Sequence, residues 1–149
     1  MHLYRMAKLA YADDLSGAGG LFGSGRWHRQ GAHILYTSEH VSLAKLEVLA
    51  NSPALPRNYG LVTLELPDTA SIQPLEIAQL PADWHLSPAP ESLLALSDAW
   101  LKTRMHWVLR VPSVHSPNEF NFLLNPLHPE HAGLRLVSVE PHPFDVRLK

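Results

Sequence analysis

Proline constrains the fold of this chain more than any other residue type, because 13 of its 149 residues are proline. A proline fixes φ, has no amide hydrogen and interrupts a helix, so helices must be short and turns frequent. Five prolines fall within residues 67–90, where we expect short strands and turns. Helical periodicity is confined to residues 39–51, with Ser38 as the expected N-cap, and to residues 91–103, which follow Pro90.

Strand-like segments account for much of the remaining sequence. They are short, rich in apolar residues and bounded by Gly, Pro, Asn or Ser. The predicted strands are residues 2–6, 32–37, 59–66, 107–111, 120–124, 134–139 and 144–148. Trp84, Trp100 and Trp107 are expected in the core, and residues 13–25 form a glycine-rich loop. The pattern predicts an α+β fold with a strand-rich core and about two main helices, in a single domain over residues 1–149.

Composition and charge exclude several classes of protein. A hydrophobic fraction of 46% is enough to build a core and argues against disorder. The formal net charge of −2 disfavours direct binding of nucleic acid. The chain has no cysteine, which excludes disulfides and cysteine nucleophiles and fits a cytoplasmic protein. No apolar run approaches ~18 residues and residues 1–5 lack the apolar core of a signal peptide, so we expect no contact with a membrane.

Ten histidines raise the question of a metal site. His128 and His131 are close in sequence, but there is no HExxH helix and no cysteine to complete a ligand set. Pro129 lies between them and would interrupt a helix outside its first turn. The remaining histidines are scattered without ligand spacing. We therefore expect loop histidines and no metal, and keep a histidine-ligated metal hydrolase as a distant alternative.

The first informative block, residues 23–51, carries three candidate site residues. The loop 23–25 leads into Arg26, Tyr36 follows near the end of a predicted strand, and Glu47 lies in the predicted helix. Each also has an ordinary interpretation, as a surface ion pair, a core aromatic and a solvated helix edge. A functional interpretation requires partners, because a carboxylate beside an apolar face is costly if it is buried unpaired. The glycines form neither a P-loop nor a GxGxxG motif, but they allow a ligand to approach an arginine that could hold a phosphate.

The second informative block spans residues 111–129. It contains Ser113 after a predicted strand, but no GxSxG motif, so Ser113 is a poor candidate for an esterase nucleophile. It is better placed to donate a hydrogen bond from the strand end, and its ordinary interpretation is a turn serine. Asn125 and Pro126 are typical of a turn, with Asn125 anchoring the backbone.

Taken in order, these two blocks resemble the RES-domain family, which is named after Arg, Glu and Ser. The matching elements are Tyr4-Arg5-Met6, Gly-Ser-Gly-Arg26-Trp27, Gly31, Tyr36-Thr-Ser38, Ala44-x-x-Glu47, Pro112-Ser113 and Asn121-Phe-Leu-Leu-Asn125-Pro126-x-His128-Pro129. The resemblance covers residues 3–147, and its ordered combination is more specific than any single element. Two positions depart from the family: His28, where Asn is usual, and Phe122, where Tyr is common.

The resemblance implies a toxin of a bacterial toxin–antitoxin pair, with a fold similar to ADP-ribosyltransferases of the diphtheria-toxin type. It implies NAD⁺ as the substrate, consumed by hydrolysis or by phosphorolysis with inorganic phosphate. Some members are reported to modify a protein with ADP-ribose instead. The implied partner is an Xre-like antitoxin that binds DNA itself and blocks the toxin's pocket. By motif position, Arg26, Tyr36, Glu47 and Ser113 carry over as the site.

The chemistry of these residue types is compatible with that implication. Cleavage of the nicotinamide–ribose bond passes through an oxocarbenium-like transition state. The leaving group is a cationic pyridinium that departs as neutral nicotinamide, so it needs no proton. One carboxylate can therefore suffice, and we expect Glu47 to stabilise the ribosyl charge. We expect Arg26 to hold the pyrophosphate, Tyr36 to stack on nicotinamide or ribose, and Ser113 to hydrogen-bond ribose or phosphate. The alternatives are a protein ADP-ribosyltransferase with the same NAD⁺ site and an inactive module that only binds an antitoxin.

Overall fold

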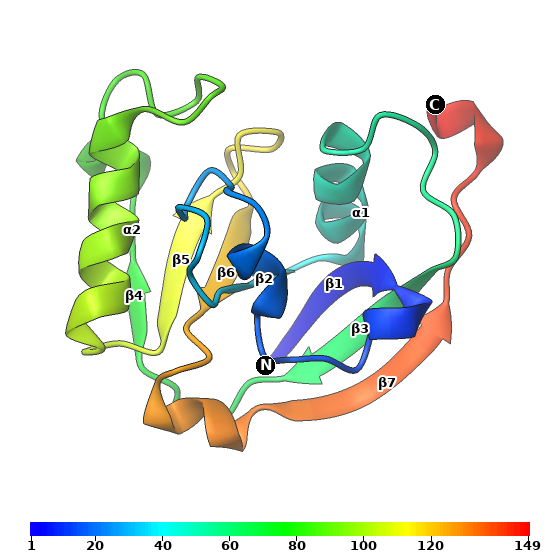
Figure 1. Ribbon diagram of the computed structural model, residues 1–149, viewed down its shortest axis with the longest axis horizontal. Coiled ribbons are helices and arrows are strands. Elements are labelled where there is room, and N and C mark those ends of the chain that lie inside the picture. Colours follow the sequence, from blue (N-terminus) through cyan, green and yellow to red (C-terminus); the bar gives the residue numbers. More distant parts are fainter.

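The computed structural model describes residues 1–149 and contains one seven-stranded mixed sheet (Figure 1). The strands follow the order β4-β5-β6-β2-β1-β3-β7, and all neighbours are antiparallel except β4 and β5. Their bounds are β1 His2–Lys8, β2 Leu35–Ser38, β3 Tyr59–Glu65, β4 Ile72–Pro74, β5 Val108–Pro112, β6 Phe120–Leu124 and β7 Arg135–Pro141. Two helices, α1 Val41–Ala50 and α2 Glu91–Thr103, and five short 3-10 turns complete the chain, so the predicted α+β class is confirmed. Neither helix is long and apolar enough to cross a membrane.

The sheet consists of two parts that meet at one point. β1 pairs with β3 along its whole length, and β2 pairs with β6 along its whole length. Between β1 and β2, however, only Tyr4 and Ser38 are in register. Beyond the Tyr4–Ser38 pair, β1 and β2 therefore move apart. The sheet opens between Lys8 at the end of β1 and Leu35 at the start of β2.

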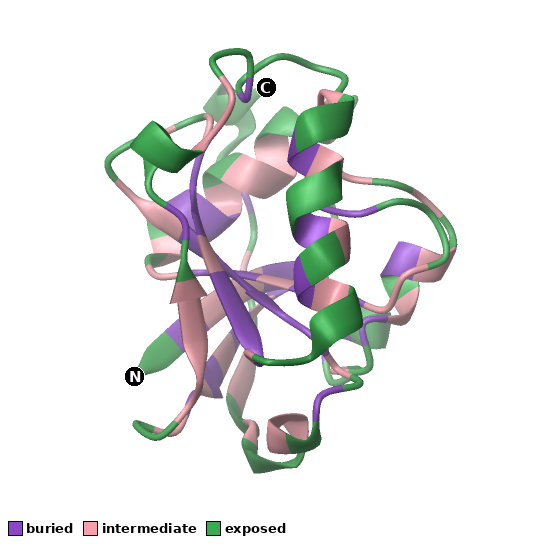
Figure 2. Cartoon of the chain, turned by 90° about the vertical axis from the view of Figure 1, so that its left-hand side faces the viewer, coloured by how far each residue is buried: buried purple, intermediate pink, exposed green.

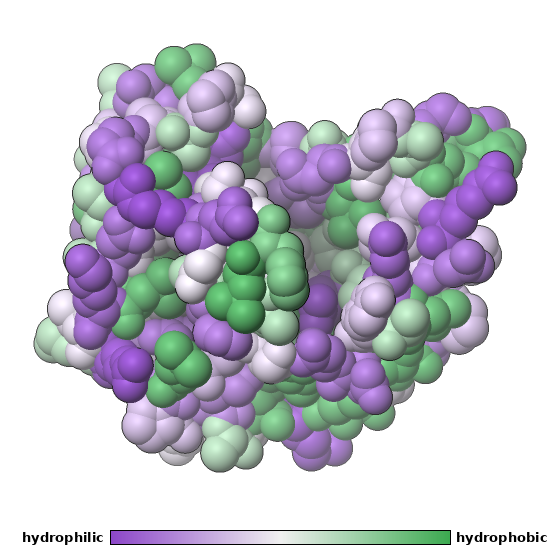
Figure 3. Space-filling model, viewed as in Figure 1, coloured by the Kyte–Doolittle hydropathy of each residue, from purple (hydrophilic) through white to green (hydrophobic).

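Both helices cover the same face of the sheet. Opposite residues on neighbouring strands point to the same side, so Tyr4 on β1 shares a face with Tyr36 and Ser38 on β2. Tyr36 packs with the cluster around α2, whereas Tyr4 packs with the cluster around α1. Figure 2 shows the buried residues of α2 on the side that faces the sheet, and Figure 3 shows the surface hollowed between the α1 side and the α2 side.

The apolar residues form three clusters, two on the face that the helices cover and one on the opposite face. The α2 cluster comprises Trp27, Ile34, Leu75, Trp84, Leu93, Trp100, Leu109, Val111 and Leu123. The opposite face holds a larger cluster that includes Leu3, Val62, Leu64, Leu66, Trp107 and Leu124. The three tryptophans expected in the core, Trp84, Trp100 and Trp107, are all buried.

The start of the first predicted helix differs from the observed one. Ser38 is not the N-cap of α1, because it is the last residue of β2 and its hydroxyl donates to Oδ1 of Asn121 at 2.6 Å. The amide of Glu39 donates to the carbonyl of Phe120 on β6, so strand pairing continues one residue beyond Ser38. The helix therefore begins at Val41, with His40 as its N-cap.

The predicted strand 144–148 is also wrong. Phe144 is buried beside α1, and residues Val146–Leu148 form a 3-10 turn. The Asp145 carboxylate accepts a hydrogen bond from the amide of Arg147 at 2.9 Å, so this local turn replaces strand pairing. Among the other elements, 91–103 and 120–124 match the observed bounds, whereas the predicted strand 32–37 begins only at Leu35.

Candidate active site

The carboxylate of Glu47 extends from α1 toward the strand ends beside it. Oε1 accepts hydrogen bonds from Oγ of Ser113 and from Nδ2 of Asn121, each at 2.7 Å. Oε2 accepts no hydrogen bond from the protein, and the side chain is 27% exposed. The carboxylate is therefore fixed through one oxygen while the other stays open to a ligand.

Strand pairing explains how these donors come to Glu47. Ser38 on β2 and Val111 on β5 both lie opposite Asn121 on β6, so the three side chains share the face that α1 covers. Asn121 uses its oxygen to accept from Ser38 and its amide to donate to Glu47. Ser113 follows β5 and is buried, with 1% exposure. A buried amide and hydroxyl with partners on every side form a rigid support for the carboxylate.

Tyr36 lies two residues before Ser38 and points to the same face of β2. Its hydroxyl is 2.7 Å from Nδ1 of His28, and Nε2 of His28 is 2.7 Å from the carbonyl of Gly23. A carbonyl only accepts, so Nε2 carries the proton and Nδ1 accepts the Tyr36 hydroxyl proton. Burial lowers the pKa of His28 and raises the pKa of Tyr36, which keeps both groups neutral.

The glycine loop is shaped to fit this tyrosine. A Cβ on Gly25 would lie 2.8 Å from the Tyr36 hydroxyl and 2.9 Å from Cε1 of His28, whereas a Cβ on Gly23 would meet nothing within 4 Å. The amide of Trp27 also donates to the Tyr36 hydroxyl at 3.3 Å. The loop therefore approaches Tyr36 closely at Gly25 and leads directly into Arg26.

Arg26 connects this loop to the segment before α2. Its Nη1 donates to the carbonyls of Trp84 and Leu86, both at 2.8 Å, and its other guanidinium nitrogens have no protein partner. Burial lowers the pKa of Arg26, and the negative charge of Glu47 opposes that effect. The guanidinium nitrogens of Arg26 other than Nη1 are therefore free to donate hydrogen bonds to an anion.

The predicted site residues are brought together to different degrees. Ser113 contacts Glu47 directly. Arg26 and Tyr36 have other hydrogen-bond partners and form none with Glu47. In the sequence, Asn121 stands out only as part of a motif, and Ser38 has the pattern of a helix cap. A polar residue in the otherwise apolar strand Phe120–Leu124 was the available signal for Asn121.

A cavity of about 630 Å³ occupies the opening between β1 and β2. Its walls are Arg5 and Met6 of β1, Leu35 and Tyr36 of β2, and the glycine-rich loop. Gly17 in this loop has φ +70° and lies so close to Ile34 that a Cβ would be 2.7 Å from its amide nitrogen. The cavity contains Tyr36 but not Arg26, Glu47 or Ser113.

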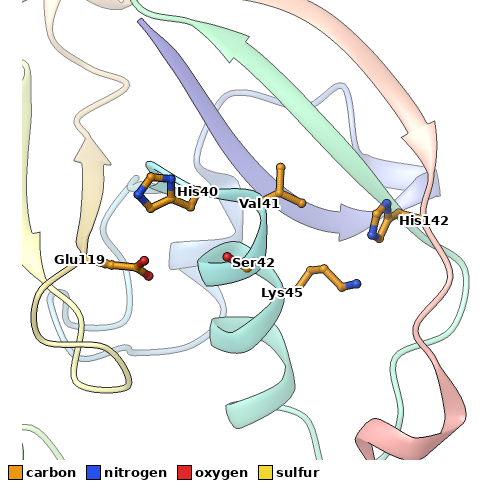
Figure 4. Close-up of a pocket in the computed structure, with 6 residues that line it drawn as sticks. All are labelled: His40, Val41, Ser42, Lys45, Glu119 and His142. Atoms are coloured by element: carbon orange, nitrogen blue, oxygen red, sulfur yellow. The ribbon is translucent and has the colours of Figure 1, made fainter.

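A second hollow of about 600 Å³ lies at the start of α1 and is shown in Figure 4. Its lining residues are His40, Val41, Ser42, Lys45, Glu119 and His142. It is open and polar, and none of the four predicted site residues lines it.

The histidines that suggested a metal site have other partners. Nδ1 of His131 accepts from the Trp107 indole at 3.1 Å, and Nδ1 of His128 accepts from the amide of Glu130 at 3.1 Å. No group of three or more His, Asp or Glu side chains is arranged to hold a metal ion.

Fold and side chains together describe an α+β protein in which Ser113 and Asn121 hold one carboxylate of α1 against the ends of the strands. The RES domain family model matches residues 2–147. The chain is 37% identical to the Prs ADP-ribosylating toxin of Sphingobium sp., over 95% of this chain and 91% of that protein. It is 39% identical to Toxin Res of Pseudomonas putida, over 99% of both chains. The chain belongs to the RES-domain family of toxins.

A solved structure has the same fold. The crystal structure of the M. tuberculosis MbcT–MbcA toxin–antitoxin complex contains a chain that superposes with a TM-score of 0.76 at 19% identity. The match covers 95% of this chain and 84% of that one. At this identity the likeness establishes the architecture only.

Proposed function

We propose that this protein consumes NAD⁺ by cleaving the bond between nicotinamide and ribose and transferring ADP-ribose to an acceptor. The observation that carries the proposal is the Glu47 carboxylate, which Ser113 and Asn121 fix through Oε1 while Oε2 stays open. A carboxylate held in this way is preorganised to stabilise the positive charge that develops on the ribose. The name of the Sphingobium relative, an ADP-ribosylating toxin, supports the same substrate.

The other site residues would orient the dinucleotide. Arg26 would hold the pyrophosphate through its free guanidinium nitrogens, and Tyr36 would stack on nicotinamide or the adjoining ribose. The cavity of about 630 Å³ beside Tyr36 has the size of a small-molecule site and would admit part of NAD⁺ between β1 and β2. Because the Ser113 hydroxyl donates to Glu47 in the free protein, we assign Ser113 to holding the carboxylate before any contact with ribose.

The acceptor decides between two forms of this activity. Water or phosphate as the acceptor would deplete NAD⁺, and a protein side chain as the acceptor would yield a modified protein. The second form is favoured by the relative that is named for ADP-ribosylation of Prs. Both use the same first step, so one site serves either.

The test is incubation of the purified protein with NAD⁺, with and without phosphate, followed by chromatography of the products. We expect loss of NAD⁺ and release of nicotinamide, and the phosphate dependence would separate phosphorolysis from hydrolysis. Mass spectrometry of treated lysate would detect transfer to a protein. A folded, partner-free protein that releases no nicotinamide under any of these conditions would contradict the proposal and favour an inactive binding module.

We further propose that the protein acts in the cytoplasm as half of a toxin–antitoxin pair, with an Xre-like antitoxin covering the site. The structural neighbour is a toxin in complex with its antitoxin, which supports a partner of this kind. We expect growth arrest on expression alone and relief on co-expression with the antitoxin. Growth unaffected by the active chain would contradict this assignment.

A further inference from the structure

His115 lies in the connection between β5 and β6, facing the open side of the Glu47 carboxylate. Its Nε2 is 3.8 Å from Oε2 of Glu47, and the two side chains are 35% and 27% exposed. This separation is too long for a direct hydrogen bond, but it lets one small oxygen atom contact both groups. Glu47 is the charged group within ion-pair distance of the ring.

The position of His115 is fixed by the residue that also fixes Glu47. The amide of His115 donates to Oγ of Ser113 at 3.1 Å, and the same hydroxyl donates to Glu47 at 2.7 Å. The connection is closed by a hydrogen bond from the amide of Ser113 to the carbonyl of Glu119 at 3.0 Å. The backbone of His115 and the carboxylate of Glu47 therefore share one serine as a hydrogen-bond partner.

The proposed reaction leaves one task without a residue. When water or a hydroxyl attacks the ribose, the attacking oxygen must lose a proton. Glu47 is committed to the developing positive charge, and its Oε1 already accepts two hydrogen bonds. Histidine is the side chain best suited to take that proton near neutral pH.

We propose that His115 is the general base for the acceptor, an inference that rests on the proposed function. The acceptor oxygen forms a bond to C1′ of the ribose, and the bond from C1′ to nicotinamide breaks. The electron pair leaves with neutral nicotinamide, and Nε2 of His115 takes the acceptor proton. A phosphate dianion already carries a negative oxygen, so its attack needs no base.

The experiment compares His115→Gln with the wild-type protein, using water and inorganic phosphate as acceptors. We expect hydrolysis of NAD⁺ to fall by about 100-fold in the variant, the size typical of general base catalysis. Phosphorolysis should be nearly unchanged. His142→Gln, from the hollow in Figure 4, is the matched control and should behave as wild type.

Three results would overturn the inference while leaving the proposed function standing. They are hydrolysis unchanged in His115→Gln, an equal loss with both acceptors, and a loss confined to phosphorolysis, which would assign His115 to anion binding. His115→Asn, with its melting temperature, separates misfolding from chemistry. Absence of NAD⁺ turnover by the folded wild type would instead remove the proposed function and this inference with it.

Discussion

The hydroxyl of Ser113 donates to Oε1 of Glu47 at 2.7 Å, across 66 positions of sequence. This bond links the end of β5 to α1 and fixes the carboxylate on which the proposed chemistry depends. The same hydroxyl accepts from the amide of His115, so one buried serine organises both sides of the site.

Replacing Ser113 with alanine should weaken this arrangement without breaking the fold. We expect a loss of about 1–3 kcal/mol in the free energy of unfolding, since the hydrogen bond to the Glu47 carboxylate and the one from the His115 amide are both removed. Turnover of NAD⁺ should fall by about tenfold or more, because a misplaced catalytic group costs rate. Ser116→Ala in the same connection is the control, and chromatographic rate assays with thermal unfolding are the measurements. Equal rates for the two variants would contradict a supporting role for Ser113.

Replacing Asn121 with aspartate should place a second carboxylate against Glu47. Two adjacent carboxylates raise the pKa of one of them above its value in the unfolded chain. The variant should therefore be destabilised at neutral pH, where the unfolded chain is ionised, and should recover stability as pH falls below that raised pKa. Unfolding at several pH values tests this, with Asn118→Asp as the exposed control. Asn121→Asp with the wild-type pH dependence would refute the contact.

The glycine loop offers a matched pair of substitutions. Gly25→Ala should lower stability by about 1–3 kcal/mol and slow turnover, because its Cβ meets Tyr36 and His28. Gly23→Ala should have little effect, since a Cβ there meets nothing within 4 Å. Melting temperatures and NAD⁺ turnover measured on both variants check the loop geometry. A Gly25→Ala protein as stable and active as Gly23→Ala would show that the loop does not press on Tyr36.

Acidification should destabilise the protein through His28 and His131. Burial lowers the pKa of His28 and of His131, so both bind a proton more readily in the unfolded chain. Their contribution is complete above the unfolded pKa of about 6.5 and is lost as pH falls from there toward the folded pKa. His28→Asn should show a smaller fall in melting temperature between pH 7.5 and pH 5.5 than the wild type. An identical fall in both proteins would mean that His28 is not the neutral partner of Tyr36.

Local signals predicted the elements whose boundaries the sequence itself marks. Pro90 and the apolar period of residues 91–103 define α2, and Asn125 and Pro126 end β6. They failed at Ser38, which has the local pattern of a helix cap but is held in the sheet by Asn121. That partner lies 83 positions away, and no local pattern contains such a pairing.

The candidate site could be predicted from the sequence only in part. Arg26, Tyr36, Glu47 and Ser113 are each ordinary alone, and their ordered combination singled them out. The supporting bond from Asn121 to Glu47 spans 74 positions and depends on strand register, which the sequence does not display. The opening between β1 and β2 was likewise unpredictable, because it arises from where two strands cease to pair.

The central claim is tested most directly by the rate at which Glu47→Gln releases nicotinamide from NAD⁺, beside the wild type at equal concentration. Glutamine keeps the shape of the side chain and removes its negative charge, so the melting temperature should change little. We predict a fall in rate of about 100-fold to 1,000-fold, the size seen when a charge-stabilising group is removed. A folded Glu47→Gln protein that releases nicotinamide at nearly the wild-type rate would contradict the account.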